Sequence, residues 1–290
     1  MITITGATGQ LGSGVIDSLI QKGFNPSNIS ALARSEEKAQ ALKDKGVNIK
    51  IGNYNDYNSL VEAFKGTDKL LLISSNEMEN RSQQQVNAVK AAKEAGVKHI
   101  LYTSIQRQAD SSDSPINFVL DSHIATEEAI KESGMNYTIL RNNLYMDMLP
   151  WVLGEQVFET GIYYPAQDGR IAYTMRSDIA EATANVLMGH NHENKDYNIS
   201  NTHSLSFQEV AVQLSVISGK TVPYTSPTVE EYKNTLVGAG APAEVADMLA
   251  GFAQGIAQGE LVADDTDLPA LLGREAVSYK EFLNSLYAQK

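Results

Sequence analysis

The sequence has no cysteine, one tryptophan and fewer basic than acidic side chains, with a formal net charge of −12. The absence of cysteine excludes disulfide bonds, thiol nucleophiles and thiolate metal ligands, and it suits a reducing compartment. The negative charge disfavours nucleic acid and anionic membranes as partners, because both carry phosphates. No apolar run approaches the roughly 20 residues that are needed to span a bilayer. Met1 leads straight into an apolar stretch without the basic segment of a secretion signal, so we expect a cytoplasmic protein.

The rest of the composition is typical of a globular protein: 42% of the 290 residues are hydrophobic and 20% are charged. A chain of this length predicts a large α/β unit with an additional lobe or a second domain. In its first half, apolar stretches alternate with helical patterns, which predicts a doubly wound parallel sheet of the Rossmann type. Strands are expected at 1–5, 28–34, 47–51, 69–73, 99–103 and 136–140, and helices from about 35 and at 56–64, 83–95 and 119–132.

A glycine-rich turn follows the first predicted strand. The residues at 6–12 read GATGQLG, and a helical pattern begins directly after them. This order of strand, turn and helix is typical of a dinucleotide-binding turn. Gly6 would let the backbone turn, Gly9 would let it approach a pyrophosphate, and Gly12 would let the helix pack onto the strand. A purely structural turn is the alternative, which the flanking strand and helix disfavour.

The pattern changes beyond Trp151. Residues 161–164 and 171–174 flank Asp168-Gly169, which predicts a β-hairpin. Further elements are expected at 177–188, 197–199, 207–218, 229–237 and 243–257, all helical except the strand at 197–199. We therefore expect a dinucleotide-binding domain at 1–150, with contributions from about 170–200. Residues 151–290 would form a smaller, mainly helical substrate lobe that closes over the carboxyl ends of the strands.

Arg34 bears on the choice of dinucleotide. It stands at the end of the second predicted strand, where an NAD site usually carries an acidic residue for the ribose 2′-hydroxyl. A guanidinium suits a 2′-phosphate instead, so the sequence favours NADP(H) over NAD(H). The alternative is a solvent-facing arginine whose charge is offset by Glu36 and Glu37.

Ser74 and Ser75 follow the fourth predicted strand, beside the point where the strand order would reverse. Small polar residues there could line the ribose and pyrophosphate of a dinucleotide, or they could only cap the strand. Their position near the glycine turn favours the first interpretation.

Four blocks together resemble one known family. GATGQLG at 6–12, LLISS at 71–75, YTS at 102–104 and YTILRN at 137–142 resemble the NmrA-like atypical short-chain dehydrogenases. Within that family the chain is most similar to bacterial type 2 NAD(P)H:quinone oxidoreductases and triphenylmethane dye reductases. The similarity extends over the whole chain, including HENK at 192–195. The glycine motif alone is shared across the superfamily, so the interior blocks carry the specific match.

The resemblance implies an NADP site near the glycine turn and a substrate pocket beyond the sixth strand. The cofactor-binding residues implied are Gly6, Thr8, Gly9, Gln10, Leu11, Gly12, Arg34, Ser74, Ser75, Thr138, Leu140, Asn142 and Asn143. The residues expected in the substrate pocket are Ser104, Tyr145 and Trp151. Met148 and Leu149 belong to the same apolar stretch, but we expect them to pack in the core between the lobes.

The chain departs from the wider superfamily at the proton donor. None of its 13 tyrosines is followed by lysine at the fourth position, and His123 and Glu127 occupy the corresponding helix. Their spacing places both on one helix face, so His123 could lie near the nicotinamide, oriented by Glu127, and either supply a proton or only line the pocket. An exposed His–Glu pair without a role in catalysis is an equally weighted alternative. Quinone or dye reduction tolerates the missing tyrosine, because solvent can protonate the product.

The sequence thus favours an NADPH-dependent reductase of a quinone-like small molecule. An NADP(H)-binding sensor without turnover is the first alternative, and a nucleotide-sugar epimerase or dehydrogenase is disfavoured by the missing tyrosine. The spacing of the five histidines predicts no metal site. We expect no nucleic-acid or membrane partner, and the sequence leaves a homodimer open.

Overall fold

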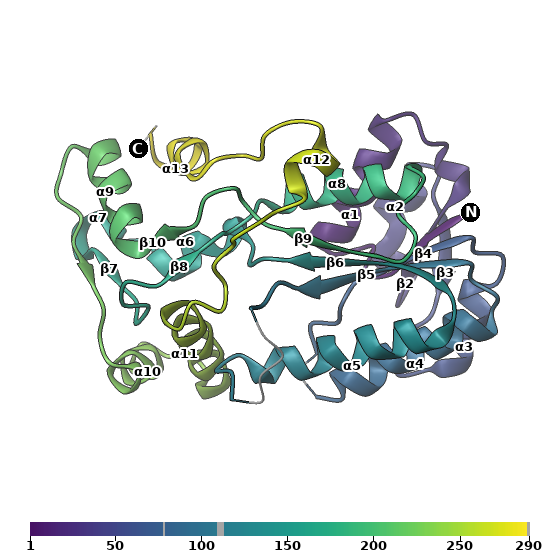
Figure 1. The fold of residues 1–290 in the computed structure, drawn as a ribbon, viewed down its shortest axis with the longest axis horizontal. Helices are drawn as coiled ribbons and strands as arrows, with labels where there is room; N and C mark the ends of the chain where they lie inside the picture. Colours follow the sequence, from purple (N-terminus) through teal and green to yellow (C-terminus); the bar gives the residue numbers. More distant parts are fainter. Residues whose placement is uncertain (78, 109–112, 289–290) are drawn as a thin grey trace.

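The computed structural model describes residues 1–77, 79–108 and 113–288, and its largest feature is a twisted parallel sheet (Figure 1). Within these residues the sheet has seven strands in the order β3-β2-β1-β4-β5-β6-β9. The strands are β1 (Ile2–Ile4), β2 (Ile29–Ala33), β3 (Asn48–Ile51), β4 (Lys69–Leu72), β5 (His99–Ile105), β6 (Asn136–Asn142) and β9 (Lys195–Ile199). The predicted Rossmann-like α/β fold is therefore confirmed.

The strand order reverses beside β1. The chain moves outward through β2 and β3, returns to β4 on the other side of β1, and continues to β5, β6 and β9. Ile4 near the carboxyl end of β1 pairs with Leu71 of β4. In open α/β sheets, ligands bind outside the carboxyl ends of the strands at such a switch point. The topology therefore places a candidate site beyond Ile4, Leu72, Ile105 and Asn142.

Helices cover both faces of the sheet (Figure 1). On one face lie α3 (Tyr57–Phe64), α4 (Arg81–Glu94) and α5 (Asn117–Ser133), and on the other lie α1 (Gln10–Gln21), α8 (Arg176–Met188) and α12 (Leu268–Leu272). The short elements η1 (Pro26–Asn28), η2 (Glu37–Ala39) and α2 (Gln40–Lys43) connect β2 with its neighbours. Strand β4 shows why the sheet is buried on both sides: Leu71 packs into the α1/α8 core, while Leu70 and Leu72 pack into the α3/α4/α5 core.

Local sequence signals explain several helix boundaries. The Asp56 carboxylate accepts a hydrogen bond from the Ser59 N–H at 3.1 Å and begins α3, as the sequence predicts. Three helices of the C-terminal part begin with capping boxes, in which a serine or threonine and a glutamate bond reciprocally to the backbone. In the described part of the chain, no helix combines the length and the apolar character needed to cross a membrane.

The C-terminal part forms a lobe beside the sheet, with its own hydrophobic core (Figure 1). Its elements are η3 (Met146–Met148), α6 (Leu149–Leu153), α7 (Val157–Thr160), β7 (Ile162–Tyr163), β8 (Arg170–Ile171), β10 (Leu205–Ser206), α9 (Phe207–Ser218), β11 (Tyr224–Thr225), α10 (Val229–Gly238), α11 (Ala243–Ala257) and α13 (Tyr279–Tyr287). Tyr164, Phe207 and Tyr232 form an aromatic group within this core. Between its elements the chain returns to the sheet as α8 and β9. A domain boundary near residue 150 stays a prediction.

The predicted hairpin around Asp168-Gly169 is wrong. β7 pairs in parallel with β11, and β8 pairs antiparallel with β10, so the two segments do not pair with each other. The turn packs closely against α11 instead: a Cβ on Gly169 would lie 2.2 Å from the Ile256 carbonyl oxygen. Gly169 therefore lets the backbone pack closely against α11, and it does not form the turn of a hairpin.

Candidate cofactor and substrate site

The glycine turn has the close backbone packing that its spacing predicts. Gly6 has a φ of +57°, and a Cβ on Gly12 would lie 2.3 Å from the Gly6 carbonyl oxygen. Only glycine at position 12 lets α1 start this close to β1. Gly9 is the exposed N-cap residue of α1 and provides no side-chain cap. The first N–H groups of α1 are therefore open to an anionic ligand, as a pyrophosphate requires.

The residues around this turn divide into an exposed and a buried group. Thr8 and Gln10 are exposed beside the turn, whereas Leu11 is buried in the α1/α8 core. Leu11 can therefore offer a ligand its backbone N–H but not its side chain. The exposed cradle fits a dinucleotide, because a phosphate can approach its backbone without a side chain in the way.

Arg34 is the first residue after β2, and its side chain is exposed. Among the described residues it makes no hydrogen bond or ion pair. Glu36 pairs with Lys43 at 3.3 Å rather than with Arg34. The guanidinium is therefore available to a phosphate that lies at the carboxyl end of β2.

Ser74 and Ser75 organise the connection from β4 to α4. The Ser74 N–H donates to the Thr103 Oγ1 at 2.9 Å, and the Ser75 hydroxyl donates to the Gln84 Oε1 at 3.2 Å. The Ser75 hydroxyl also accepts the Glu77 N–H at 3.1 Å. These bonds explain both serines as parts of a folded turn. A contact with the cofactor stays a prediction.

Thr138 and Leu140 both lie within β6, and both side chains are buried. Thr138 is in the first half of β6 and fully buried, and its hydroxyl donates to the His192 carbonyl oxygen at 2.7 Å. The same hydroxyl oxygen lies 2.8 Å from the His99 Nε2. Leu140 is buried in the α1/α8 core. The structure thus gives both side chains structural contacts, and a contact with the cofactor stays a prediction.

Asn142 and Asn143 end β6 and lie at the expected edge, but their amides differ. The Asn143 Nδ2 donates to the Gln106 Oε1 at 3.0 Å and to the Leu261 carbonyl oxygen at 2.9 Å, which ties the sheet to the lobe. Both amide atoms of Asn142 are buried and have no hydrogen-bond partner in the described part of the chain. A buried amide without partners costs about 1–3 kcal/mol, which makes Asn142 a candidate ligand contact.

His123 is buried and does not form the expected pair with Glu127. Its Nε2 lies 2.9 Å from the Arg81 Nη2, and its Nδ1 lies 2.8 Å from the Tyr102 hydroxyl. A guanidinium only donates, so Nε2 must accept and Nδ1 must carry the proton. Burial and the charge of Arg81 hold the pKa of His123 well below its usual value of 6.5. The ring is therefore neutral near neutral pH.

Glu127 is held by two arginines. Arg107 binds both of its carboxylate oxygens at 2.9 and 3.1 Å, and Arg141 binds both at 3.4 and 2.8 Å. The Ser104 hydroxyl donates to the same carboxylate at 2.5 Å. Burial would raise the pKa of Glu127, but these hydrogen bonds outweigh it and lower the pKa to about 2. Two predictions are thus wrong: His123 and Glu127 do not form an exposed pair, and Glu127 does not orient His123. Ser104, which was expected in the substrate pocket, lies in the network around Glu127.

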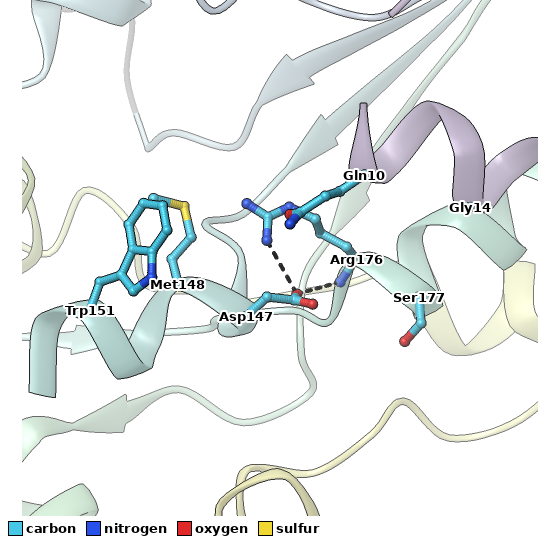
Figure 2. A pocket seen from close by; sticks show the side chains of 7 residues that line it. All are labelled: Gln10, Gly14, Asp147, Met148, Trp151, Arg176 and Ser177. Carbon is cyan, nitrogen blue, oxygen red and sulfur yellow. Dashed lines mark hydrogen bonds and ion pairs between the residues drawn. The ribbon is translucent and has the colours of Figure 1, made fainter. Parts of the chain in front are cut away.

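A cavity of about 430 Å³ opens between the start of α1 and the segment after β6 (Figure 2). Its lining residues are Gln10, Gly14, Asp147, Met148, Trp151, Arg176 and Ser177. The Trp151 side chain is 80% exposed and stands beside Met148, across the cavity from Gln10 and Arg176 (Figure 2). Met148 therefore lines the cavity instead of packing in the core, whereas Leu149 is buried in the core as expected.

Arg176 joins the cavity to Tyr145. Its guanidinium lies over the Tyr145 ring, 4.3 Å from the ring centre. Its backbone N–H donates to the Asp147 carboxylate at 2.8 Å (Figure 2). A flat aromatic molecule in this cavity would meet an indole, a thioether and a cation, which suits π-stacking and cation–π contacts.

Sequence reasoning missed Arg81 and Arg176. Both are the first residue of an α-helix, where a positive charge is unfavourable next to the helix dipole. Such a local conflict is a signal of function that could have singled them out. The described residues contain no group of three histidine, aspartate or glutamate side chains that could hold a metal ion.

Comparison with known proteins gives consistent matches over the whole chain. The model of the NmrA-like family matches residues 1–266. Quinone oxidoreductase 2 of Escherichia coli (strain K12) is 38% identical and aligns with 99% of each chain. An NAD(P)H azoreductase of Xenophilus azovorans is 30% identical over 97% of this chain and 96% of its own. The crystal structure of Citrobacter sp. triphenylmethane reductase complexed with NADP(H) superimposes with a TM-score of 0.89 at 38% identity, covering 98% and 99% of the two chains.

Proposed function

Because the chain belongs to the NmrA-like family, we propose that it is an NADPH-dependent reductase that passes hydride to a quinone or a similar flat electrophile. One observation supports this most directly: the open glycine turn and the unpaired Arg34 lie at neighbouring strand ends, and Gln10 of that turn also lines the cavity. A cofactor on the turn would therefore reach the place where an acceptor can bind.

The chain's own groups suit NADPH at three points. The N–H groups at the start of α1 would bind the pyrophosphate, and Arg34 would bind the 2′-phosphate. The unpartnered amide of Asn142 lies at the end of β6, where it can hydrogen-bond the nicotinamide carboxamide. Bound NADPH supplies a hydride. Relatives with the same fold support this cofactor, since one has been crystallised with NADP(H).

The acceptor would lie against Trp151 and Met148. His123 is not a proton donor near neutral pH, because both of its nitrogens are engaged and its pKa is low. Reactions that require an enzymatic proton donor, such as epimerisation or alcohol–ketone exchange, are poorly served by this arrangement. A strongly electrophilic acceptor needs only hydride from the site and can take its proton from water. The protein then acts by positioning the two reactants.

The first experiment follows NADPH oxidation through the nicotinamide absorbance, with a small panel of quinones, a triphenylmethane dye and NADH in place of NADPH. Turnover of a quinone with preference for NADPH supports the proposal. Tight NADPH binding without turnover of any acceptor contradicts it and favours a cofactor sensor.

A charge-removing pair of variants tests the cofactor site separately. Arg34→Ala should raise the KM for NADPH about 10- to 100-fold while changing that for NADH little, because it removes charge-assisted hydrogen bonds worth about 1.5–3 kcal/mol. Lys90→Ala removes an exposed positive charge from α4 and should leave both KM values unchanged. An unchanged cofactor preference in Arg34→Ala would show that this residue does not bind the 2′-phosphate.

A further inference from the structure

Arg81 is a buried cation that has no counter-charge in the described part of the chain. Its side chain begins α4 and the residue is 9% exposed. Within the described residues its one hydrogen bond goes to the His123 Nε2 at 2.9 Å, it makes no ion pair, and its Nε–H is buried without a partner. A guanidinium cannot lose its charge to relieve this burial. An uncompensated buried charge of this kind is strongly unfavourable unless something binds it.

The residues next to Arg81 do not neutralise it. His123 is neutral, as its tautomer and lowered pKa show, and the Tyr102 hydroxyl beyond it stays protonated because burial raises the Tyr102 pKa. Glu127 lies on the same helix as His123, but its oxygens bind Arg107, Arg141 and Ser104. Arg81 therefore keeps a net positive charge at this place.

Arg81 also lies at the edge of the sheet where the strands have their carboxyl ends, which is where the candidate site is expected. Helix α4 begins after the carboxyl end of β4, and the residue bonded to Arg81 is bonded in turn to Tyr102 of β5. The charge of Arg81 reaches Tyr145, where it opposes the rise in pKa that burial causes. Tyr145 in turn lies under Arg176, which lines the cavity.

A second unsatisfied group flanks the same phenol. The Asn142 amide lies close to the Tyr145 hydroxyl, whose pKa it helps to lower, and in the described part of the chain neither of its buried polar atoms makes a hydrogen bond of ordinary geometry. Two unsatisfied polar side chains, from α4 and from β6, thus approach Tyr145. The charges of Arg81 and Arg176 act on Tyr145 together with one carboxylate, that of Asp147, which is paired with Arg176. Among these described neighbours the region is therefore net positive, and it offers N–H donors. Such an environment favours a ligand oxygen that carries negative charge.

We infer that Arg81 binds the oxygen of a quinone-type acceptor and stabilises the negative charge that this oxygen gains during reduction. The inference rests on the proposed function. In the step, a C–H bond of the reduced nicotinamide breaks, its hydrogen and two electrons pass to the neutral quinone, and the quinone becomes a hydroquinone monoanion. One proton from water then gives the neutral hydroquinone. Arg81 donates to the oxygen while it is negative.

The same charge selects among acceptors. A cationic triphenylmethane dye becomes neutral when it accepts hydride on carbon, and it forms no oxyanion. Arg81 cannot assist this reaction, and its charge repels the dye. The substrate class assigned to the site is therefore neutral carbonyl acceptors that become anionic on oxygen, in preference to cationic dyes.

Arg81→Met tests the inference in kinetics, because methionine replaces the charge with an apolar chain of similar length. Loss of one donor to a developing oxyanion lowers kcat about 10²- to 10³-fold in other enzymes, and we expect such a loss with a quinone. Turnover of a cationic dye should stay the same or rise. Arg81→Lys should recover part of the quinone activity. Lys90→Met removes an exposed charge from the same helix and is the matched control.

A binding measurement makes the test independent of turnover. 4-Nitrophenol changes its absorbance on ionisation, so its ionisation can be titrated while it is bound to the protein. The wild type and Lys90→Met should lower the pKa of the bound phenol, and Arg81→Met should return it to the value in water. Thermal unfolding should show Arg81→Met to be at least as stable as the wild type, because the substitution removes an unpaired buried charge.

Two results would overturn the inference. One is an equal loss of quinone and dye turnover in Arg81→Met. The other is 4-nitrophenol that fails to bind the wild type, or that ionises equally in the wild type and Arg81→Met. If none of the tested acceptors supports NADPH oxidation by the wild type, the proposed function fails. The 4-nitrophenol titration still decides whether Arg81 binds an oxyanion.

Discussion

Replacing Glu127 with glutamine should destabilise the protein strongly. Its carboxylate is the counter-charge of Arg107, and both side chains are almost fully buried, at 5% and 6% exposed. Arg141 binds the same carboxylate. Glutamine carries no charge, so the buried guanidinium of Arg107 loses its charge-assisted hydrogen bonds to position 127, and breaking a buried ion pair in this way typically costs 3–5 kcal/mol. Urea unfolding at neutral pH should therefore show a loss of about 3–5 kcal/mol in the free energy of unfolding.

The pH dependence of stability gives a second estimate from the same residue. The pKa of Glu127 is lowered from 4.5 to about 2, and each pKa unit is worth about 1.36 kcal/mol, so the ionised carboxylate contributes about 3 kcal/mol. Because the folded-state pKa is the lower one, this contribution is fully present above pH 4.5 and is lost as the pH falls toward 2. The wild type should lose this extra stability in that window, and Glu127→Gln should not.

Glu128→Gln is the matched control, since Glu128 is the exposed neighbour on the same helix and its substitution should change stability by less than about 0.5 kcal/mol. The reasoning fails if Glu127→Gln costs under about 1 kcal/mol at neutral pH. It also fails if the difference between the wild type and Glu127→Gln is the same at pH 7 and at pH 2.

Three further predictions concern the site. Gly12→Ala should cost about 1–3 kcal/mol in stability and weaken NADPH binding, because the new Cβ would overlap the Gly6 carbonyl. Thermal unfolding measures the first effect and calorimetric titration the second, and an unchanged NADPH affinity would contradict the role of this turn. Trp151→Ala should raise the KM for a quinone about 2- to 10-fold and leave the KM for NADPH unchanged, since one aromatic contact is worth about 0.5–1.5 kcal/mol. Equal changes in the two KM values would count against the indole as an acceptor contact. The profile of kcat against pH should show no step near pH 6.5, because the pKa of His123 lies well below that value; a step that disappears in His123→Asn would refute its assignment as a neutral residue.

The sequence predicts most of the fold because its strong signals are local. Apolar strands alternate with helical patterns through the first half, and the glycine spacing encodes contacts within one turn, such as Gly12 against Gly6. The false hairpin shows the limit. β7 pairs with β11, 62 residues further along the chain, and β8 pairs with β10, 34 to 36 residues further along. No local pattern specifies such distant partners.

The candidate site shows the same limit. The spacing of His123 and Glu127 places both on one helix face, but their partners Arg81, Arg107 and Arg141 come from other elements. Strand length matters as well: β6 was expected to end at Leu140 and continues to Asn142. The strand is therefore two residues longer than expected, and the amide of its last residue, Asn142, is buried without a hydrogen bond in the described part of the chain.

The side-chain amide of Asn143 holds the backbone in place where the chain passes from the sheet into the C-terminal lobe. Its bonds reach Gln106 at the end of β5 and Leu261 in the far C-terminal chain, 37 and 118 residues away. The cavity wall that includes Trp151 begins a few residues later and so starts from an anchored backbone. The backbone that leads to Trp151 is thereby tied to the sheet, which also carries the glycine turn. Evolution can vary the outer helices of the lobe without turning the acceptor away from the cofactor.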